Sequence, residues 1–208
     1  TAQIGLTAFM GLLSAKTSFG VFQMNHPGLL WFFAALAFIT MFAVSCYSSL
    51  ARKVPTNYIL LGIFTFSEAY SVSFTVGAYT LSGYGNLVLW AAFLTVCMTL
   101  TITYYAFTTK TDFTIMGGLM FCLAAGLIFL AILTIFTDNP FINCLVTVCG
   151  IVVYGVYLIY DTQLIAGGKK HEFTVDDYIV AAMQIYVDII VLFLEILKLL
   201  KQLTDKND

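Results

Sequence analysis

The chain has 208 residues, of which 61% are hydrophobic and only 10% are charged, and its mean hydropathy is +0.95. This composition lies far outside that of a soluble domain and predicts an integral membrane protein whose main partner is the lipid bilayer. The formal charge of −2 comes with no basic surface run, so nucleic acid is not expected as a partner.

Apolar runs separated by polar or turn-forming clusters predict the membrane-spanning elements. A helix needs roughly 20 apolar residues to cross the hydrocarbon, and lipid favours helices because they satisfy their own backbone groups. We therefore expect an all-α integral membrane protein, a seven-helix bundle in one transmembrane domain, 1–208. The predicted spans are 1–22, 29–51, 57–80, 87–109, 114–136, 141–165 and 177–201.

The first apolar run, 2–15, is short for a span, and the chain begins at Thr1 without an initiator Met. We therefore expect a further N-terminal part before it.

Basic residues in the loops predict the orientation. Those that follow spans two, four and six are Arg52, Lys53, Lys110, Lys169 and Lys170. The opposite side has Lys16, so the even-numbered loops and the N-terminus are expected in the cytosol. A full crossing by the last span puts further basic residues on the far side, namely Lys198, Lys201 and Lys206. Either segment 177–201 dips into the membrane and returns to the same side, or the chain is an exception to the rule that basic residues lie on the cytosolic side. The length of 177–201 favours a full crossing.

Two aspartates lie deep within apolar runs, Asp161 in 145–163 and Asp188 in 181–192. A carboxylate inside the bilayer is costly, so an intramembrane acid indicates a functional site. The helical rise places the two within about two turns of the same depth, on either arm of one hairpin. If they meet, they are expected to share a proton and to titrate as a unit. We therefore predict a pH sensor and gate at Asp161 and Asp188.

The same pair is a candidate metal site. Carboxylate oxygens suit a hard cation, and calcium is the expected one, although two carboxylates make only a weak, transient site. The alternative is that each aspartate caps a helix or bonds a neighbouring hydroxyl. The hydroxyls available are those of Tyr160, Thr162 and Tyr186.

Two glutamates are candidates for an ion pathway. Glu68 lies about halfway along its span and should face the bundle interior, either as a pathway residue or as a structural partner. Glu195 follows Asp188 by seven residues on the same helical face and extends an acidic stripe, or else it pairs with Lys198, three residues further on. The pairing with Lys198 is the favoured interpretation of Glu195.

Arg52 and Lys53 end the second span on its cytosolic side. They offer either a counter-charge for the aspartate pair or a positive-inside anchor.

No enzyme is expected, because the sequence has no Gly-rich phosphate loop, no nucleophile elbow and no paired histidines with metal spacing. No cofactor is expected either, with calcium acting as a permeant ion. The five cysteines lie in apolar runs without metal-ligand spacing and are expected to be buried free thiols.

Five short segments are distinctive when taken together. They are FTFSEA at 64–69, TKTDFT at 109–114, YDTQ at 160–163, DYIVAA at 177–182 and IYVDII at 185–190. In this order they resemble the transmembrane Bax-inhibitor-motif family, more closely its lifeguard branch, and within that the Golgi anti-apoptotic, lifeguard four type.

The resemblance implies a Bax-inhibitor-like fold in which the seventh helix is central and enclosed by the other six. It also implies a pH-sensitive calcium leak gated at Asp161 and Asp188, with Arg52 or Lys53 at the basic end of the second helix. Family members dampen cell death by lowering stored calcium, and the Golgi or endoplasmic reticulum is the expected location, with the mitochondrial inner membrane or plasma membrane as alternatives. Span 29–51 has no acid, so a latch from that span to Lys198, which some relatives are thought to use, is not available here.

Two functions therefore remain open from the sequence. The first is a proton-regulated calcium leak channel of an intracellular membrane. The second is a non-conducting, membrane-embedded regulator or accessory subunit that binds other membrane proteins, in which the aspartates form a structural clamp. A retinal-binding pump is disfavoured, because Lys198 lies near the end of its span rather than well inside it.

Overall fold

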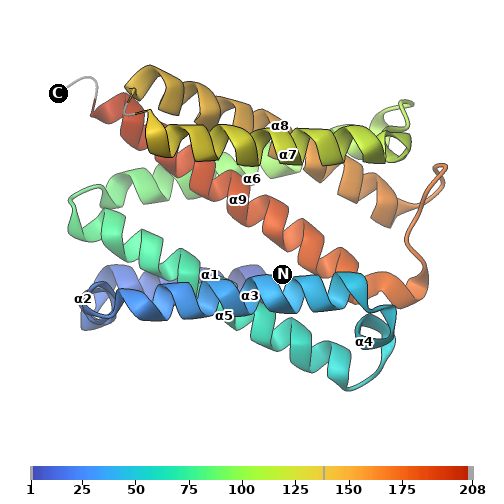
Figure 1. Cartoon of the computed structure of the whole chain (residues 1–208), viewed down its shortest axis with the longest axis horizontal. Helices are drawn as coiled ribbons and strands as arrows, with labels where there is room; N and C mark the ends of the chain where they lie inside the picture. Colours follow the sequence, from blue (N-terminus) through green and yellow to red (C-terminus); the bar gives the residue numbers. More distant parts are fainter. Residues whose placement is uncertain (1, 138, 206–208) are drawn as a thin grey trace. The chain divides into compact units, whose positions relative to one another are not determined.

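The computed structural model describes residues 2–137 and 139–205, and all regular elements in this part of the chain are helical (Figure 1). The helices are α1 (Ala2–Lys16), α2 (Ser18–Asn25), α3 (Pro27–Cys46), α4 (Ser48–Arg52), α5 (Thr56–Leu81), α6 (Gly85–Thr108), α7 (Gly117–Phe136), α8 (Pro140–Ala166) and α9 (Tyr178–Thr204). Short 3-10 turns, η1 (Phe113–Met116) and η2 (Val175–Asp177), precede α7 and α9. The all-α prediction is confirmed.

By length and composition, six helices among the described residues can cross a membrane, or up to seven if α1 and α2 together form one bent span. The chain is thus a multi-pass membrane protein. The prediction of one continuous helix over 1–22 is wrong, because α1 and α2 meet at a bend of 91°. Span 29–51 is also interrupted, since α3 ends before Tyr47 and α4 begins after it.

The chain packs as two compact units. The first runs to Val88 and adds Thr174–Tyr186, while the second takes Leu89–Phe173 and continues from Val187. Helix α9 therefore begins in the first unit and continues in the second. The organisation as a single transmembrane domain stays a prediction, and Lys206, one of the charges that bears on orientation, lies outside the described residues.

In the first unit, α1, α2 and α3 pack on α5, and small residues set the bend between α1 and α2. A Cβ on Gly20 would lie 2.4 Å from the backbone oxygen of Ser14, so this position needs glycine for the close approach. Ser14 donates to the buried amide of Gln23 at 2.7 Å, and Gln23 in turn donates to Ser73 of α5 at 2.9 Å. This network fixes α2 across the end of α1.

In the second unit, α7 packs on α8, and the loop before α7 is tied to the end of α8. The buried Gln163 accepts from the backbone of Phe113 at 2.8 Å and donates to the backbone of Thr111 at 3.0 Å. Asp112 accepts from the hydroxyl of Thr114 at 2.6 Å and from the backbone of Lys170 at 3.1 Å. The two loops at this end of the second unit therefore form one hydrogen-bonded assembly.

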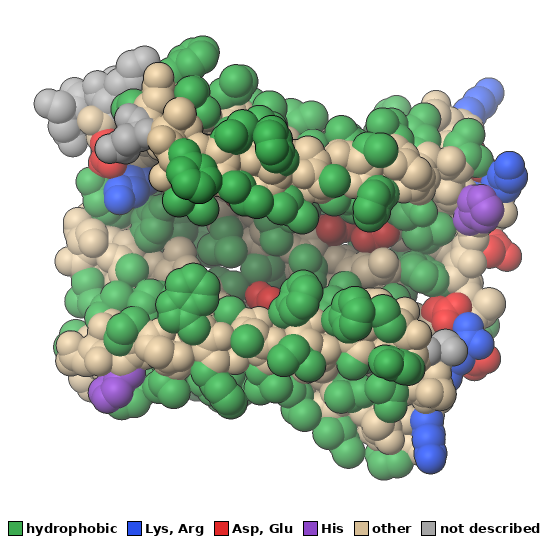
Figure 2. Space-filling view, viewed as in Figure 1, with side chains coloured by type: hydrophobic (Ala, Val, Ile, Leu, Met, Phe, Trp, Pro, Cys, Tyr) green, Lys and Arg blue, Asp and Glu red, His purple; other side chains and the backbone are tan. Residues whose placement is uncertain are grey.

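The outer faces of the helices are apolar. Figure 2 shows hydrophobic side chains along the helices, with charged side chains concentrated at the helix ends. All five cysteines are free, but Cys46, Cys97 and Cys122 are exposed on these outer faces rather than buried. Apolar sequence alone did not distinguish a lipid-facing position from a core position, because both are hydrophobic in a membrane protein.

Candidate functional site

Two carboxyl groups meet within the second unit. Asp161 lies near the end of α8 and Asp188 lies on α9, and each residue is only 4% exposed. Their carboxyl groups are hydrogen-bond partners. The structure therefore brings together the two aspartates that the sequence singled out. One oxygen of the pair, Asp188 Oδ2, is buried and makes no hydrogen bond.

The hairpin between α8 and α9 determines where the first of these aspartates lies. Helix α8 ends because Gly167 adopts a φ of 72°, which side-chain-bearing residues rarely take. The backbone of Phe173 then donates to the carbonyl of Leu164 at 2.9 Å and folds the loop back over the helix end. Asp161 is left about 8 Å inside α8, clear of the loop.

The alternative partners for the aspartates were neighbouring hydroxyls. The hydroxyl of Tyr186 instead bonds the hydroxyl of Thr7 at 2.6 Å, within the first unit. Tyr186 is 2% exposed, so this contact lies in the core of that unit. Asp161 and Asp188 bond each other.

Glu195 lies on α9, two turns beyond Asp188, and is half-buried. Its Oε2 atom is buried and has no hydrogen-bond partner. The charge of Lys198 acts on its carboxyl group, and the favoured pairing with Lys198 stays a prediction. Gly150 of α8 faces it closely: a Cβ there would lie 3.3 Å from the Glu195 carboxyl carbon.

Glu68, the other candidate pathway residue, lies on α5 in the first unit and is half-buried. It is close enough to Tyr186 for its charge to act on that phenol. Its neighbour Ser67 is buried with a hydroxyl that has no hydrogen-bond partner. Glu68 thus lies partly buried in the first unit, and its place in an ion pathway stays a prediction.

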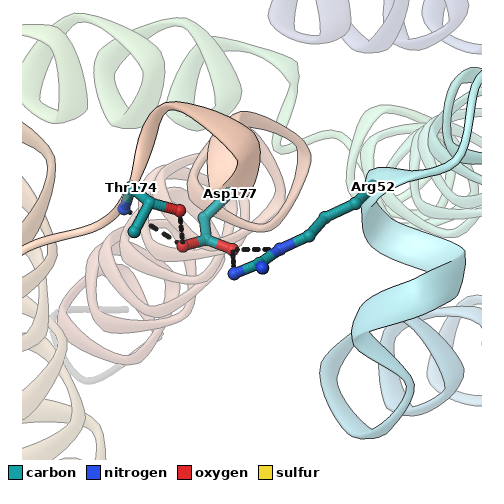
Figure 3. Close-up of polar contacts among 3 residues, drawn as sticks. All are labelled: Arg52, Thr174 and Asp177. Carbon is teal, nitrogen blue, oxygen red and sulfur yellow. Dashed lines mark hydrogen bonds and ion pairs between the residues drawn. The ribbon is translucent and has the colours of Figure 1, made fainter.

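Arg52 makes an ion pair that the sequence did not predict (Figure 3). Its Nη2 and Nε atoms donate to Asp177 Oδ1 at 2.8 and 3.2 Å. The other oxygen of Asp177 accepts from the hydroxyl and backbone of Thr174 at 2.6 and 3.0 Å. The hydrogen bond and charge of Asp177 raise the pKa of Arg52. This contact joins α4 to the start of α9 within the first unit, while Lys53 beside it is exposed.

A sequence signal for Asp177 was present. Thr174 and Asp177 form a capping box, in which each side chain accepts from the backbone of the other residue, directly before the apolar run of α9. That pattern predicts the start of the helix and an acid held rigidly there. It does not reveal that Arg52, far away in the chain, supplies the second partner.

The metal-binding capacity of the site is small. No group of three or more histidine, cysteine, aspartate or glutamate side chains that could hold a metal ion occurs in the described ranges 2–137 and 139–205. The aspartate pair offers carboxylate oxygens from two residues only. Such a donor set fits a hard cation in passage better than a resident one.

The geometry and the comparisons together define the class of protein: a multi-pass helical membrane protein with a buried pair of aspartates between its last two long helices. A family model described as "Inhibitor of apoptosis-promoting Bax1" matches residues 1–205. The chain belongs to this family, the Bax inhibitor family, whose members are membrane proteins implicated in the regulation of apoptosis.

Relatives with curated names support the lifeguard branch. The chain is 29% identical over 196 residues to protein lifeguard 3 of Mus musculus and 32% identical over 170 residues to protein lifeguard 3 of Homo sapiens. These matches cover 92% and 80% of the chain, but only 62% and 53% of the two lifeguard proteins. The chain is also 26% identical over 210 residues to Bax inhibitor 1 of Schizosaccharomyces pombe. This match covers 100% of the chain and 75% of that protein. The finer assignment to the lifeguard four type stays a prediction.

Proposed function

We propose that the chain is a pH-sensitive calcium leak channel of an intracellular membrane, gated by Asp161 and Asp188. One observation carries this proposal: the two carboxyl groups are buried in hydrogen-bonded contact, with Asp188 Oδ2 left without a partner. Two adjacent buried carboxyl groups gain and lose protons as a unit, and the change in their charge is what a proton-regulated gate requires.

The gate follows from the chemistry of two adjacent carboxyl groups. One shared proton allows them to hydrogen-bond, and this holds α8 and α9 together. Loss of that proton leaves two negative charges side by side, which repel each other and attract a hard cation. Calcium flux is therefore expected to rise as the pH rises and the pair loses its proton.

The proposed topology has seven crossings. The bent pair α1–α2 counts as the first span, and the N-terminus lies in the cytosol. Helix α9 is the proposed inner helix of the bundle; its apolar window is 44% buried, the same share as that of α5. The Golgi or endoplasmic reticulum is the proposed location, where the leak would lower stored calcium and so dampen cell death.

The test is calcium flux from proteoliposomes that contain the purified chain, measured with an entrapped indicator between pH 5 and 8. Asp161→Asn and Asp188→Asn are each expected to change the flux and to flatten its dependence on pH. Glu172→Gln is the matched control, because it removes one negative charge from an exposed loop. Unchanged flux and an unchanged pH response in both aspartate variants would refute the gate.

The same preparation distinguishes the alternative, a non-conducting regulator or accessory subunit. That function predicts no calcium flux at any pH, together with stable copurification of other membrane proteins. A leak channel predicts flux from the isolated chain.

A further inference from the structure

Gln163 holds the end of α8 from the side that faces away from the aspartate pair. It follows Asp161 by two residues, which turns its side chain by about 200° around the helix axis. The carboxyl group of Asp161 bonds that of Asp188 on α9, whereas the amide of Gln163 bonds the loop before α7. The end of α8 is therefore held by Asp188 on one side and by this loop on the other.

The Gln163 amide spends its hydrogen bonds on backbone groups of α6 and the loop after it. Its nitrogen donates to the carbonyls of Ala106 at 3.3 Å and Thr111 at 3.0 Å, and its oxygen accepts from the backbone of Phe113 at 2.8 Å. Gln163 is buried, with 1% of its surface exposed. A shift of α8 away from the loop would break these bonds and leave buried polar groups unpaired, which is costly.

The same loop also bonds the segment that follows α8. The hydroxyl of Thr114 accepts from the backbone of His171 at 3.1 Å, and the Nζ atom of Lys169 donates to the carbonyl of Thr109 at 3.2 Å. Residues 109–114 and 167–173 are called the loop assembly below. Helix α8 is thus attached to the loop assembly both through Gln163 and through the chain that leaves its C-terminus.

We propose that Gln163 is a positioning residue of the aspartate gate, which holds Asp161 in contact with Asp188 by bonding the loop assembly. This inference rests on the proposed function and deepens it. Loss of the shared proton creates two negative charges that repel each other, and the bonds of Gln163 oppose the movement of α8 that would separate them. The contact through Gln163 therefore favours the protonated, closed pair.

The charged and titratable groups around the pair allow this effect to be separated from a change of charge. Helices α6 and α7 carry no charged residue. The phenols on which the charges of the pair act are those of Tyr154, Tyr157 and Tyr160 on α8. The charged or titratable residues of the loop assembly are Lys110, Asp112, Lys169, Lys170, His171 and Glu172, and those further along α9 are Glu195, Lys198 and Lys201. A neutral substitution at Gln163 or Thr114 leaves all of these groups in place.

Infrared spectroscopy of the purified full chain tests the inference without requiring conduction. A protonated carboxyl group absorbs apart from a carboxylate, and the signal of the pair is the part that the Asp161→Asn/Asp188→Asn variant lacks. We expect Gln163→Leu to lower the pH midpoint of this signal by about half a pH unit or more, which is about a threefold change in proton affinity. Thr114→Val removes the bond to His171 and should shift the midpoint in the same direction.

Gln202→Leu is the matched control, because it removes a glutamine amide that donates to Thr147, toward the other end of α8. It is expected to leave the midpoint unchanged. Elution volume and helical circular dichroism establish that each variant is folded, and Thr114→Val decides the question if Gln163→Leu does not fold.

An unchanged or raised midpoint in the folded loop-assembly variants, or an equal shift in Gln202→Leu, would overturn the positioning role. The expected shift together with absent calcium flux would support the positioning of the pair and overturn only the channel. A wild-type chain without a titrating carboxyl signal would overturn both.

Discussion

The aspartate pair and the Arg52–Asp177 ion pair differ in their exposure to solvent. This difference decides what each pair can do. Asp161 and Asp188 are 4% exposed, whereas the side chains of the ion pair are 46% and 20% exposed. An exposed ion pair contributes little and is screened by salt. The ion pair therefore positions the start of α9, and the buried aspartates are the groups of the proposed gate.

Arg52→Ala is expected to lower the thermal stability of the purified protein only slightly, and less still at about 1 M salt, where screening is strong. Asp177→Ala should cost several times more, because it also removes two hydrogen bonds with Thr174 that cap the helix. Melting temperatures in low and high salt measure both effects. A large, salt-independent loss in Arg52→Ala would contradict this interpretation.

Asp112 makes a pH-dependent contribution outside the membrane spans. The Thr114 hydroxyl, with the backbone groups of Lys170 and Thr114, holds the pKa of Asp112 below its usual range. A depressed pKa means that the contribution is complete above the ordinary value and is lost only as the pH falls through the depressed one. Loop protection from hydrogen exchange, corrected for intrinsic rate, should thus be equal at pH 7 and pH 5 and fall several-fold in Asp112→Ala. Protection lost between pH 7 and pH 5 would require a pKa raised above the ordinary value of an aspartate and would contradict this interpretation.

At the scale of elements, hydropathy predicted the helices well where a span is straight. The predicted 141–165 and 57–80 correspond to α8 (Pro140–Ala166) and α5 (Thr56–Leu81). The bend between α1 and α2 was missed because Lys16 and Thr17 interrupt the apolar run only briefly, while the bend itself depends on contacts with α5.

Asp161 and Asp188 could be predicted because a charged residue within an apolar run can be recognised from the sequence alone. The ion-pair partner of Arg52, Asp177, could not be predicted, because it lies 125 residues away in the sequence.

The bend gives a prediction at this scale. Gly20→Ala places a Cβ 2.4 Å from the Ser14 carbonyl oxygen, so the helices must separate, at a cost of about 1–3 kcal/mol. Gly5→Ala is the matched control on α1, because nothing lies within 4 Å of its Cβ and alanine favours a helix by up to about 1 kcal/mol. Thermal unfolding in detergent should show Gly20→Ala destabilised and Gly5→Ala unchanged or stabilised. Equal effects would mean that the close approach at Gly20 is unimportant.

For the whole molecule, the number of crossings follows from the same bend. Six helices of the described part are each long enough to span, and the bent pair decides whether there is a seventh crossing. Seven crossings put the two ends of the chain on opposite sides of the membrane, and six put them on the same side. Charge counting alone does not decide this, because Lys198 and Lys201 at the end of α9 oppose the orientation that Arg52, Lys110 and Lys169 favour.

We expect opposite sides, with the N-terminus in the cytosol. The polar contacts of α2 with α5, from Gln23 to Ser73 and to the backbone of Tyr70, bury α2 against a spanning helix, which suits a bent crossing better than a surface-bound helix. Epitope tags fused to each end, probed with antibody after selective permeabilisation of the plasma membrane, report the two sides. A glycosylation acceptor in the loop between α5 and α6 provides the internal control, because that loop should then be lumenal. Both tags on the same side of the membrane, which is the lumenal side if the loop between α5 and α6 is lumenal, would establish six crossings and remove α1 and α2 from the bundle's spans.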